Sequence, residues 1–512
     1  MKKILITSIA LMVFAFYTGA QNMLVLHPEK AETLINKNIY GHFSEHLGTL
    51  IYGGIFVDED SDIPNTNGYR NDVLEALKEL KVPVLRWPGG CFADTYHWRD
   101  GVGPREDRPS IVNVFWGGVT EDNSFGTHEF LDFCELIGTE PYLSINSGSG
   151  TVREAAEWVE YVTSGNQSPM ADLRRQNGRE EPWDVKFWGV GNESWGCGGD
   201  MRPEYYADIY RHYAGYIRGN NLERVAVGPS SGDYNWTEKV MSGLSDKLHL
   251  VQGLSLHHYT LPTNSWSGSK GSATDFEEDQ WFSTFKHTLE VEEYIVKHLE
   301  IMDKYDPEGR VSLIVDEWGT WYDPLPGSNP GFLQQQNTIR DALVAGVNLN
   351  IFNNYAERIS MANIAQIVNV LQAMILTDGP EMVKTPTYYA FKMYNVHQDA
   401  TLIPTSLISE KYEYDGEELP AITSSASVKD GVTNITLTNV NPNNAVNIDC
   451  YLNGVDFKSI SGQIISADVM NAYNDFGKEE KVNIANFDVK KPNNNILSLE
   501  IPAHSVVLLQ LK

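Results

Sequence analysis

Eight short apolar runs, separated by longer amphipathic segments, constrain the fold of this chain more than any other feature. Each run mixes β-branched and aromatic side chains, which is typical of a buried strand, and the segments between the runs have helical periodicity. The runs cover residues 39–43, 82–87, 140–146, 185–189, 224–228, 254–259, 311–317 and 359–368. This alternation predicts an α/β protein with a parallel (β/α)8 barrel, the TIM-barrel architecture.

An open, doubly wound sheet is the alternative fold for such an alternation. The number of strands favours the barrel, and the chain lacks the glycine-rich phosphate fingerprint of doubly wound folds. After residue 393 the pattern changes to short, roughly alternating segments, some of them separated by turns such as Asp430-Gly431 and Asn453-Gly454. This part of the sequence predicts a C-terminal antiparallel β-sandwich domain.

These patterns divide the chain into four parts. Residues 34–392 are expected to form the barrel and residues 393–512 the sandwich, and the strand-like segment within 21–33 is expected to join the sandwich. Residues 1–20 have the pattern of a signal peptide, because Lys2-Lys3 precedes an apolar run and small residues follow it. That run is too short for a comfortable membrane span. The sequence therefore predicts an exported protein, periplasmic or extracellular, without membrane insertion.

Composition limits the partners of this 512-residue chain. It carries 39 Lys and Arg against 68 Asp and Glu, a formal net charge of −29. Nucleic acids and anionic membranes repel a polyanion, so neither is expected as a partner. The chain also has 12 Trp, 25 Tyr and 19 Phe. Most of these rings are expected in the core, but flat aromatic faces also suit uncharged polar ligands such as sugars.

The four cysteines lack the spacing of a zinc site. Cys134 falls in an apolar helical segment and is expected to be buried. Cys91 and Cys197 each follow glycines at the ends of predicted strands. Because an exported protein meets an oxidising environment, we expect these two cysteines to form a disulfide.

Polar side chains gather at the carboxyl ends of the predicted strands, where a barrel carries its chemistry. Two of them, Glu193 and Glu317, have tryptophan neighbours. Such a pair suits glycoside hydrolysis, in which one carboxyl group donates a proton to the leaving oxygen and the other is ionised. The residues at these strand ends are Glu45, Arg86, Asn146, Asn192, Glu193, Tyr259, Glu317 and Gln366.

Six motifs resemble those of the α-L-arabinofuranosidases of glycoside hydrolase family 51. They are Gly191-Asn192-Glu193, Asp316-Glu317-Trp318 and the segments 40–48, 86–90, 98–104 and 365–370. They occur in the family's order, and the resemblance covers nearly all of the chain after residue 20. It implies a retaining, exo-acting enzyme that releases terminal arabinofuranose from arabinan- or arabinoxylan-type polysaccharides or oligosaccharides of plant cell walls.

The resemblance also implies roles for individual residues. Glu193 would be the acid/base and Glu317 the nucleophile, with the two carboxyl groups roughly 5–5.5 Å apart. The substrate-binding residues would be Glu45, Asn192, Tyr259, Gln366, Trp98 and Trp321, with Asn192 on the sugar's 2-hydroxyl. Cys91 is counted with them, although many members of the family carry Asn at this position. No cofactor or metal is expected, and the resemblance indicates a homo-oligomer.

Two histidine patterns allow another interpretation. Residues 42–46 match the H-x-x-E-H motif of zinc peptidases, which requires a helix. Here the motif ends a predicted strand and is flanked by glycines, so we expect no metal there. His257 and His258 alternate along a strand and must point to opposite faces. His257 is therefore expected to be an active-site residue that forms hydrogen bonds.

Two other functions remain open on the sequence alone. A related retaining barrel hydrolase, an endo-glucanase or a xylosidase, would differ in its loops rather than in its catalytic pair. A non-catalytic carbohydrate-binding protein would not need both Glu193 and Glu317.

Overall fold

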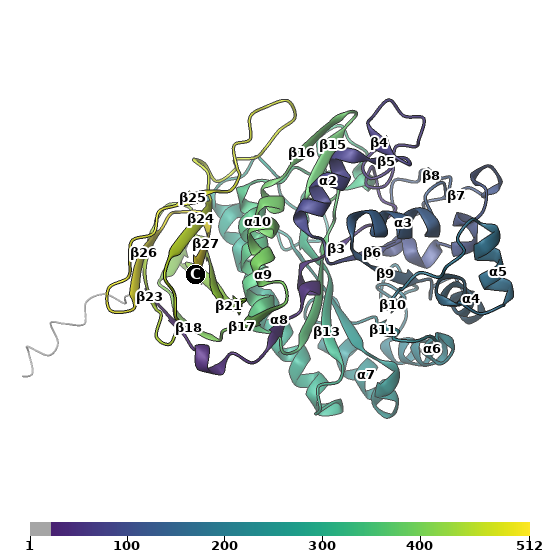
Figure 1. Ribbon diagram of the computed structural model, residues 1–512, viewed down its shortest axis with the longest axis horizontal. Helices are drawn as coiled ribbons and strands as arrows, with labels where there is room; N and C mark the ends of the chain where they lie inside the picture. The colour runs from purple at the N-terminus through teal and green to yellow at the C-terminus, as the bar shows by residue number, and fades with distance from the viewer. Residues whose placement is uncertain (1–21) are drawn as a thin grey trace, which may run out of the picture.

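The computed structural model describes residues 22–512, as a barrel followed by a sheet-rich C-terminal domain (Figure 1). The predicted signal peptide, residues 1–20, lies outside the described residues. Eight parallel strands close in the order β10-β11-β12-β13-β14-β3-β6-β9, which confirms the predicted barrel and excludes the open sheet. The strands are β3 (Gly41–Phe43), β6 (Val84–Trp87), β9 (Glu140–Ile145), β10 (Phe187–Val190), β11 (Glu223–Ala226), β12 (Gly253–Thr260), β13 (Ser312–Thr320) and β14 (Ile359–Ala365).

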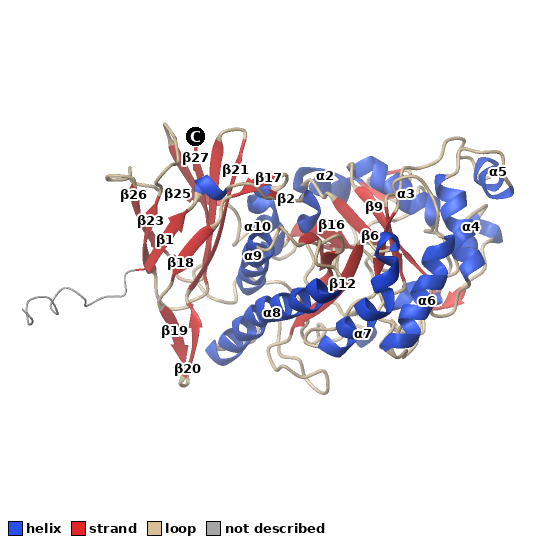
Figure 2. Cartoon of the chain, turned by 90° about the horizontal axis from the view of Figure 1, so that it is seen from below, coloured by secondary structure: helices blue, strands red, loops and turns tan. Residues whose placement is uncertain are grey.

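Helices surround the barrel and connect its strands (Figure 2). Several begin at side chains that accept a hydrogen bond from a free backbone N–H, as Thr151 does from Glu154. Thr338 and Asp341 form a reciprocal capping box at another. The helices are α2 (Asn71–Leu80), α3 (Thr127–Ile137), α4 (Val152–Thr163), α5 (Pro169–Gln176), α6 (Pro203–Tyr216), α7 (Tyr234–Leu244), α8 (Glu278–Tyr305), α9 (Ile339–Asn354) and α10 (Pro386–Tyr394).

The interior of the barrel changes from apolar to polar along its axis. The end of the barrel at which the strands begin is filled by one side chain from each of six strands. Because side chains alternate along a strand, the residue two positions further on points inward one layer higher. Arg86 follows Val84 and Asp316 follows Ile314 in this way, so the polar layer rests on a packed floor. The floor residues are Val84, Tyr142, Phe187, Val225, Ile314 and Met361.

Two sheets form the C-terminal domain, at the opposite end of the molecule from α4 and α5 (Figure 1). The first has the order β18-β1-β23-β26, and the second β2-β17-β21-β22-β27-β24-β25. All pairings in these sheets are antiparallel except that of β1 with β23. The strands are β1 (Asn22–Leu26), β2 (Leu34–Ile35), β17 (Ala400–Leu402), β18 (Thr405–Ile408), β21 (Ile422–Lys429), β22 (Val432–Asn439), β23 (Val446–Tyr451), β24 (Ile460–Ile465), β25 (Ala485–Phe487), β26 (Ile496–Ile501) and β27 (Ser505–Leu511).

Four short hairpins complete the strands. They are β4 (Asn65–Thr66) with β5 (Tyr69–Arg70), β7 (Ile111–Val112) with β8 (Thr120–Glu121), β15 (Ile375–Asp378) with β16 (Glu381–Lys384), and β19 (Lys411–Tyr414) with β20 (Glu417–Pro420). The β7–β8 hairpin belongs to the long connection between β6 and α3, on the side of the barrel where the strands end.

Helix α9 joins the barrel to the sandwich, and its residues from Ile339 to Asn353 are buried. Asn350 Oδ1 accepts hydrogen bonds from the hydroxyls of Ser425 and Thr436, and Asn353 Nδ2 donates to Ser425. We propose a barrel domain that ends near residue 392 and a sandwich made of residues 393–512 together with the N-terminal segment. Because β2 pairs with β17, we extend that segment to Ile35.

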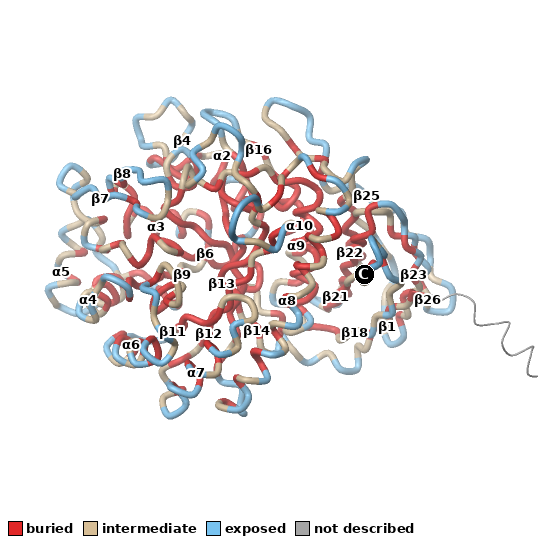
Figure 3. The backbone as a smooth tube through the Cα atoms, turned by 180° about the vertical axis from the view of Figure 1, so that it is seen from behind, coloured by how far each residue is buried: buried red, intermediate tan, exposed pale blue. Residues whose placement is uncertain are grey.

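Buried backbone runs continuously from the barrel strands through α9 into the sandwich, while exposed residues lie mainly in outer loops and on outer helix faces (Figure 3). Among the described residues, no helix combines the length and the apolar character needed to cross a bilayer.

Candidate active site

The carboxyl ends of the barrel strands enclose a cavity of about 270 Å³. Eight of the residues predicted from the sequence line it: Glu45, Cys91, Glu193, His257, Tyr259, Glu317, Trp321 and Gln366. Asn192 is buried at the adjoining end of β10, and Trp98 lies elsewhere.

A tight turn after β10 positions Glu193. Gly191 has φ 94°, and a Cβ atom there would lie 2.2 Å from Ser147 Oγ. Glu193 itself has φ 38°, a left-handed conformation that non-glycine residues rarely adopt and that is often found at functional sites. Its side chain is 18% exposed and contacts His257. The glycine noted in the sequence therefore permits a turn that presents the carboxyl group to the cavity.

Asp94 holds this turn in place and was missed in the sequence. Its Oδ2 accepts a hydrogen bond of 3.0 Å from the Asn192 amide, and its Oδ1 accepts the amides of Ser147 and Gly148 at 2.8 and 2.7 Å. Burial raises the pKa of Asp94 to about 7, although these backbone donors act in the opposite direction. One carboxyl group thus ties together the loops that follow β6, β9 and β10.

Both carboxylate oxygens of Glu317 accept hydrogen bonds at the end of β13. Arg86 Nη1 donates to Oε1 at 2.8 Å, and the Tyr259 hydroxyl donates to Oε2 at 3.0 Å. The side chain is almost fully buried, with 6% exposed. These donors fix the carboxylate in one orientation and stabilise negative charge on it.

His257 lies between three carboxyl groups. Its Nδ1 is 2.8 Å from Glu193 Oε1 and 3.5 Å from Glu317 Oε2, and its Nε2 is 3.1 Å from Asp316 Oδ1. Burial lowers the pKa of His257, but the charges of Glu317 and Asp316 and the hydrogen bonds to Asp316 and Glu193 outweigh burial and raise it to about 10. At neutral pH the ring is therefore an imidazolium that donates from both nitrogens.

The environments of Glu193 and Glu317 differ as the two roles in glycoside hydrolysis require. Burial, reinforced by the charge of Glu317, raises the pKa of Glu193, whereas His257 acts to lower it. One oxygen from each carboxyl group and one nitrogen of His257 lie within 4.8 Å of one another. The nearest carboxyl oxygens are therefore close enough for the roughly 5–5.5 Å separation of retaining glycosidases, whereas the carboxyl groups of inverting enzymes lie roughly 6.5–9.5 Å apart.

Arg86 connects Glu317 to Asn192. Besides its bond to Glu317, it donates from Nη2 to Asn192 Oδ1 at 2.7 Å, and its Nε is 3.6 Å from Asp316 Oδ2. Tyr142 also donates to Asp316, at 2.9 Å. Arg86 is buried, and the carboxylates raise its pKa even though burial opposes this. The amide NH2 of Asn192 faces the other way, 3.7 Å from Cys197 Sγ.

Glu45, which follows β3, forms part of another wall of the cavity. Its Oε1 accepts hydrogen bonds from the Phe92 amide and from Trp116 Nε1, at 3.0 and 2.8 Å, and its Oε2 accepts one from Gln366 Nε2 at 3.1 Å. Burial and the charge of Glu317 raise the pKa of Glu45 to about 7. Trp116, in the turn of the β7–β8 hairpin, was missed; the adjacent Gly117 and Gly118 were its only signal in the sequence.

Trp98 is not a wall of the cavity, which corrects its predicted position. It is 2% exposed, stacks on Trp158 and donates from Nε1 to the Glu154 carbonyl. The short helix that begins at Trp98 directs the ring towards α4 instead. Trp116, Trp266 and Trp321 line the cavity, and Trp266 and Trp321 meet edge to face with ring centroids 5.2 Å apart.

The H-x-x-E-H residues point to different parts of the structure. His42 packs against Phe391, and burial lowers its pKa to about 3. The His46 ring lies between Glu121, 2.9 Å from Nδ1, and Trp87, whose Nε1 donates to Nε2. The two imidazoles therefore do not converge on a common ligand position.

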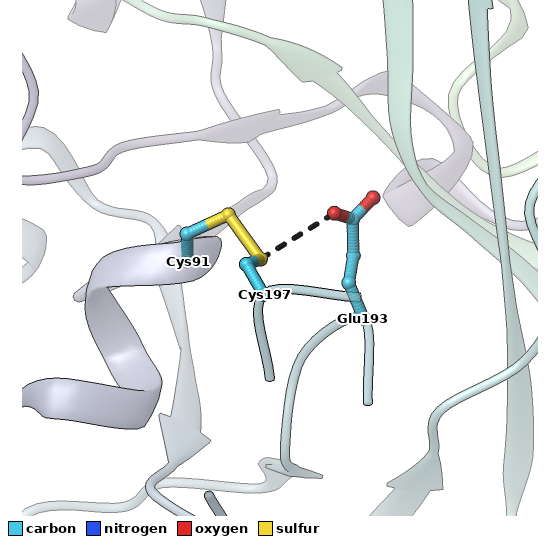
Figure 4. A group of neighbouring side chains, drawn as sticks. All are labelled: Cys91, Glu193 and Cys197. Carbon is cyan, nitrogen blue, oxygen red and sulfur yellow. Dashed lines mark hydrogen bonds between the residues drawn. A yellow bond between two sulfur atoms is a disulfide. The ribbon is translucent and has the colours of Figure 1, made fainter. Parts of the chain in front are cut away.

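The disulfide predicted between Cys91 and Cys197 is present and joins the loops after β6 and β10. Its Cα atoms are 5.4 Å apart. Figure 4 shows the carboxyl group of Glu193 beside it, with Oε2 3.6 Å from Cys197 Sγ. The bridge thus forms part of the wall next to Glu193.

A parallel barrel with two differently held carboxyl groups facing one cavity defines a glycoside hydrolase. Family models described as the α-L-arabinofuranosidase 1 domain and the α-L-arabinofuranosidase C-terminal domain match residues 76–267 and 316–505. An intracellular exo-α-L-arabinofuranosidase of Bacteroides ovatus is 53% identical over 100% of both chains. The α-L-arabinofuranosidase C of Emericella nidulans is 34% identical, with 95% of this chain and 97% of the relative covered.

Solved structures agree with these relatives. The family 51 arabinofuranosidase of Xanthomonas axonopodis pv. citri superposes with a TM-score of 0.93 at 48% identity, covering 96% of this chain and 100% of that one. An arabinose complex of the Thermotoga maritima α-L-arabinofuranosidase gives a TM-score of 0.82 at 30% identity, with 96% and 99% covered. The chain belongs to the α-L-arabinofuranosidases of glycoside hydrolase family 51. It is an enzyme, and the interpretation as a non-catalytic binding protein is dismissed.

The prediction of an exported, secreted protein is wrong. The Bacteroides ovatus relative, which aligns over the full length of this chain, is named intracellular. The prediction relied on two lysines, an apolar run and small residues at the N-terminus, and these lie outside the described residues. Such a pattern is short and compositional, and it specifies no contact that a fold must satisfy.

Proposed function

We propose that this protein is an exo-α-L-arabinofuranosidase that releases single terminal arabinofuranose units with retention of configuration. The observation that carries the proposal is the cluster of Glu193, His257 and Glu317, whose facing atoms lie within 4.8 Å. Retaining enzymes need the two carboxyl groups this close, because one of them attacks the sugar directly. The names of the Bacteroides and Xanthomonas relatives support the same activity.

In the first step Glu317 attacks the anomeric carbon while Glu193 donates its proton to the departing glycosidic oxygen. Arg86 and Tyr259 hold the attacking oxygens in position. The raised pKa of Glu193 keeps the proton available. The products of this step are a glycosyl ester on Glu317 and an ionised Glu193, whose charge the His257 imidazolium faces at 2.8 Å.

In the second step Glu193 takes a proton from a water molecule, and the oxygen of that water attacks the anomeric carbon. The ester bond to Glu317 breaks, arabinose leaves, and Glu193 is again protonated. His257 contacts both carboxyl groups, so it is placed to compensate whichever of them carries charge.

The walls of the cavity support an exo mode of action. Its volume of about 270 Å³ suits a single pentose rather than several sugars of a polymer. Glu45, Asn192 and Gln366 offer acceptors and donors for the hydroxyl groups of the ring. The amide oxygen of Gln366 is buried and has no hydrogen-bond partner among the described residues, so a sugar hydroxyl would satisfy it.

For the natural substrate we propose arabinose-containing oligosaccharides derived from arabinan or arabinoxylan. The Bacteroides ovatus relative is named both exo-acting and intracellular, and a site inside a cell meets short oligosaccharides rather than cell-wall polymers. Trp266 and Trp321 at the mouth would contact the next sugar. A homo-oligomer remains a proposal, which light scattering after size exclusion would test.

A panel of aryl glycosides tests the activity. We expect hydrolysis of the α-L-arabinofuranoside and little turnover of the β-D-xyloside or β-D-glucoside. Proton NMR of the first product should detect the α-anomer. Preference for the xyloside or glucoside would favour the related barrel hydrolases, and a β-anomer as first product would contradict the roles of Glu193 and Glu317.

A further inference from the structure

The disulfide lies against the group that we propose as the acid/base. Cys91 begins the short helix after β6, and Cys197 lies in the loop after β10 (Figure 4). Cys91 lines the catalytic cavity. Cys197 Sγ is 3.6 Å from Glu193 Oε2 and 3.7 Å from Asn192 Nδ2. Both sulfur atoms are therefore next to the position where the substrate's leaving group departs.

We propose that reduction of this disulfide creates a binding site for Zn²⁺, formed by the sulfur atoms of Cys91 and Cys197 and by Glu193 Oε2, and that the bound ion inactivates the enzyme. The inactivation rests on the proposed role of Glu193, whereas the metal site itself does not.

The geometry of the three ligand atoms supports this site. The two sulfur atoms and one oxygen of Glu193 lie within 4.8 Å of one another. Tetrahedral zinc with bonds of about 2.3 Å to sulfur and about 2.0 Å to oxygen holds such atoms roughly 3.5 Å apart. The distance from Cys197 Sγ to Glu193 Oε2 is already 3.6 Å. The two sulfur atoms must separate to roughly 3.8 Å, and Cys91 Sγ must lie roughly 3.5 Å from Glu193 Oε2. Rotation of the two short cysteine side chains brings about both changes once the bond is broken.

The chemistry of the site balances with a dithiol as the reductant. The dithiol supplies two electrons and two protons, the S–S bond breaks, two cysteine thiols form, and the dithiol becomes a cyclic disulfide. Zinc then displaces both thiol protons and the proton of Glu193, which pass to the solvent, and binds two thiolates and one carboxylate. Two thiolates and a carboxylate are ligands that suit Zn²⁺, and a fourth position stays open for water.

Bound zinc occupies the carboxyl group of Glu193, which protonates the leaving group. A carboxylate that coordinates the ion cannot carry the proton required in the first step. Glu317 is outside the site and keeps its contacts with Arg86 and Tyr259. The expected inhibition is therefore strongest for substrates that need help from an acid.

A second position for a cation competes with this one. Glu193, His257 and Glu317 also bring three ligand atoms within 4.8 Å. His257, however, is placed to donate to Glu193 and Asp316 from its two nitrogens, which leaves no lone pair for a metal. Binding there would also not depend on the cysteines, so the two positions are distinguished by their response to reduction.

The reduced form of the enzyme, with Cys91 and Cys197 as free thiols, is relevant because disulfides rarely persist in reducing compartments. The Bacteroides ovatus relative is named intracellular. The bridge that forms the wall beside Glu193 in this structure would be open wherever glutathione or thioredoxin-like dithiols are plentiful.

Zinc titration of two forms of the full-length enzyme tests the proposal. One sample is left oxidised, and the other is reduced with dithiothreitol, which is then removed without oxygen. We expect Zn²⁺ to inhibit arabinofuranoside hydrolysis by the reduced form at a concentration about 100-fold lower than for the oxidised form. Addition of a chelator should restore the activity. Equal inhibition of both forms would overturn the proposal.

Cobalt provides a readout that is independent of activity. Co²⁺ in place of Zn²⁺ should give thiolate-to-cobalt charge-transfer absorption with the reduced enzyme and none with the oxidised enzyme. Glu193→Gln should keep this absorption but bind the ion more weakly, because the thiolates remain. Cobalt absorption without any inhibition would support the site and contradict the acid/base role of Glu193.

Cysteine variants locate the site, each compared with its own metal-free activity. Cys197→Ser should raise the inhibitory zinc concentration to that of the oxidised enzyme. Cys450→Ala is the matched control, since Cys450 is a free, buried cysteine in the sandwich, and it should leave the response unchanged. Cobalt absorption that survives in Cys197→Ser would contradict the proposal. The reduced wild-type enzyme needs no variant to fold, and circular dichroism before and after reduction checks its structure.

Discussion

His257 Nδ1 lies 2.8 Å from Glu193 Oε1, so an imidazolium from β12 faces the carboxyl group at the end of β10. This contact couples the two carboxyl groups of the active site, because the same nitrogen is 3.5 Å from Glu317 Oε2. A positive charge shared by both groups helps to hold them in one small cavity despite their mutual repulsion.

Replacement of His257 by Gln should move the pH profile. Loss of the positive charge raises the pKa of Glu193, so the basic limb of kcat/KM should shift to higher pH. A role limited to packing would lower activity without such a shift.

The free energy of unfolding should also depend on His257. The pKa of His257 is raised from about 6.5 to about 10, so its contribution to folding is complete below pH 6.5 and is lost as pH rises through 10. Urea unfolding of both proteins across this range measures it.

Glu317→Gln should reduce kcat by about a thousandfold or more, because an amide cannot form the glycosyl ester. The fold should persist, since the amide can still contact Arg86 and Tyr259. Glu293→Gln is the matched control on the exposed face of α8, where Glu293 pairs with Lys297. Near-normal turnover by Glu317→Gln would contradict its assignment as the nucleophile.

Glu193→Gln should affect poor leaving groups most. An activated aryl leaving group needs little protonation, whereas an arabino-oligosaccharide depends on it. We expect losses of about 10²–10⁴-fold on oligosaccharides and much smaller losses of the first step on dinitrophenyl glycosides. Pre-steady-state kinetics separates that step from ester hydrolysis. Equal losses on both substrates would count against an acid role.

Asp94→Asn should lower kcat by about ten- to a hundredfold with a smaller change in KM, because one backbone donor among three would meet an amide NH2.

The Asp94→Asn substitution should also remove a pH dependence of stability. The pKa of Asp94 is raised to about 7, so its contribution is full below its usual value near 4 and is lost as pH rises through 7. Thermal unfolding at pH 5 and pH 8 would detect the difference.

Trp116→Phe and Trp98→Phe form a pair that tests which tryptophan contacts the substrate. Trp116 donates to Glu45, so its replacement should raise KM. Trp98 donates to a carbonyl of α4, so its replacement should cost about 1 kcal/mol of stability and leave KM unchanged. The opposite pattern of KM values would restore Trp98 to the site.

Most of the predicted residues that line the cavity lie near the carboxyl ends of regular strands. Alternation of side chains and closure of the barrel bring Glu45, His257, Tyr259 and Glu317 together, and both features can be inferred from a periodic pattern. Asp94 and Trp116 lie in the long connection between β6 and α3, whose path has no period. For the same reason the sequence could not distinguish Trp98, which turns towards α4, from Trp116.

Prediction from the sequence has a similar limit in the sandwich. Residues 496–511 have the pattern of one continuous strand-like segment, but a turn at Pro502 and His504 divides it into β26 and β27, in different sheets. Alternation predicts that strands are present, whereas the assignment of each strand to a sheet depends on contacts between distant segments.

The N-terminal strand β1 pairs with β18 and β23, so that Met23 lies opposite Ile408 and Asn22 donates to the carbonyl of Asn447. During synthesis β1 therefore lacks both of these partners until the residues of β18 have emerged from the ribosome, and β23 follows later still. The barrel can collapse on its own contacts in that interval, while the two sheets of the sandwich are completed only by β26 and β27. Deletion of β1, or of β26 and β27, should consequently damage the same domain, and a barrel produced alone would expose the face of α9 that the sandwich covers.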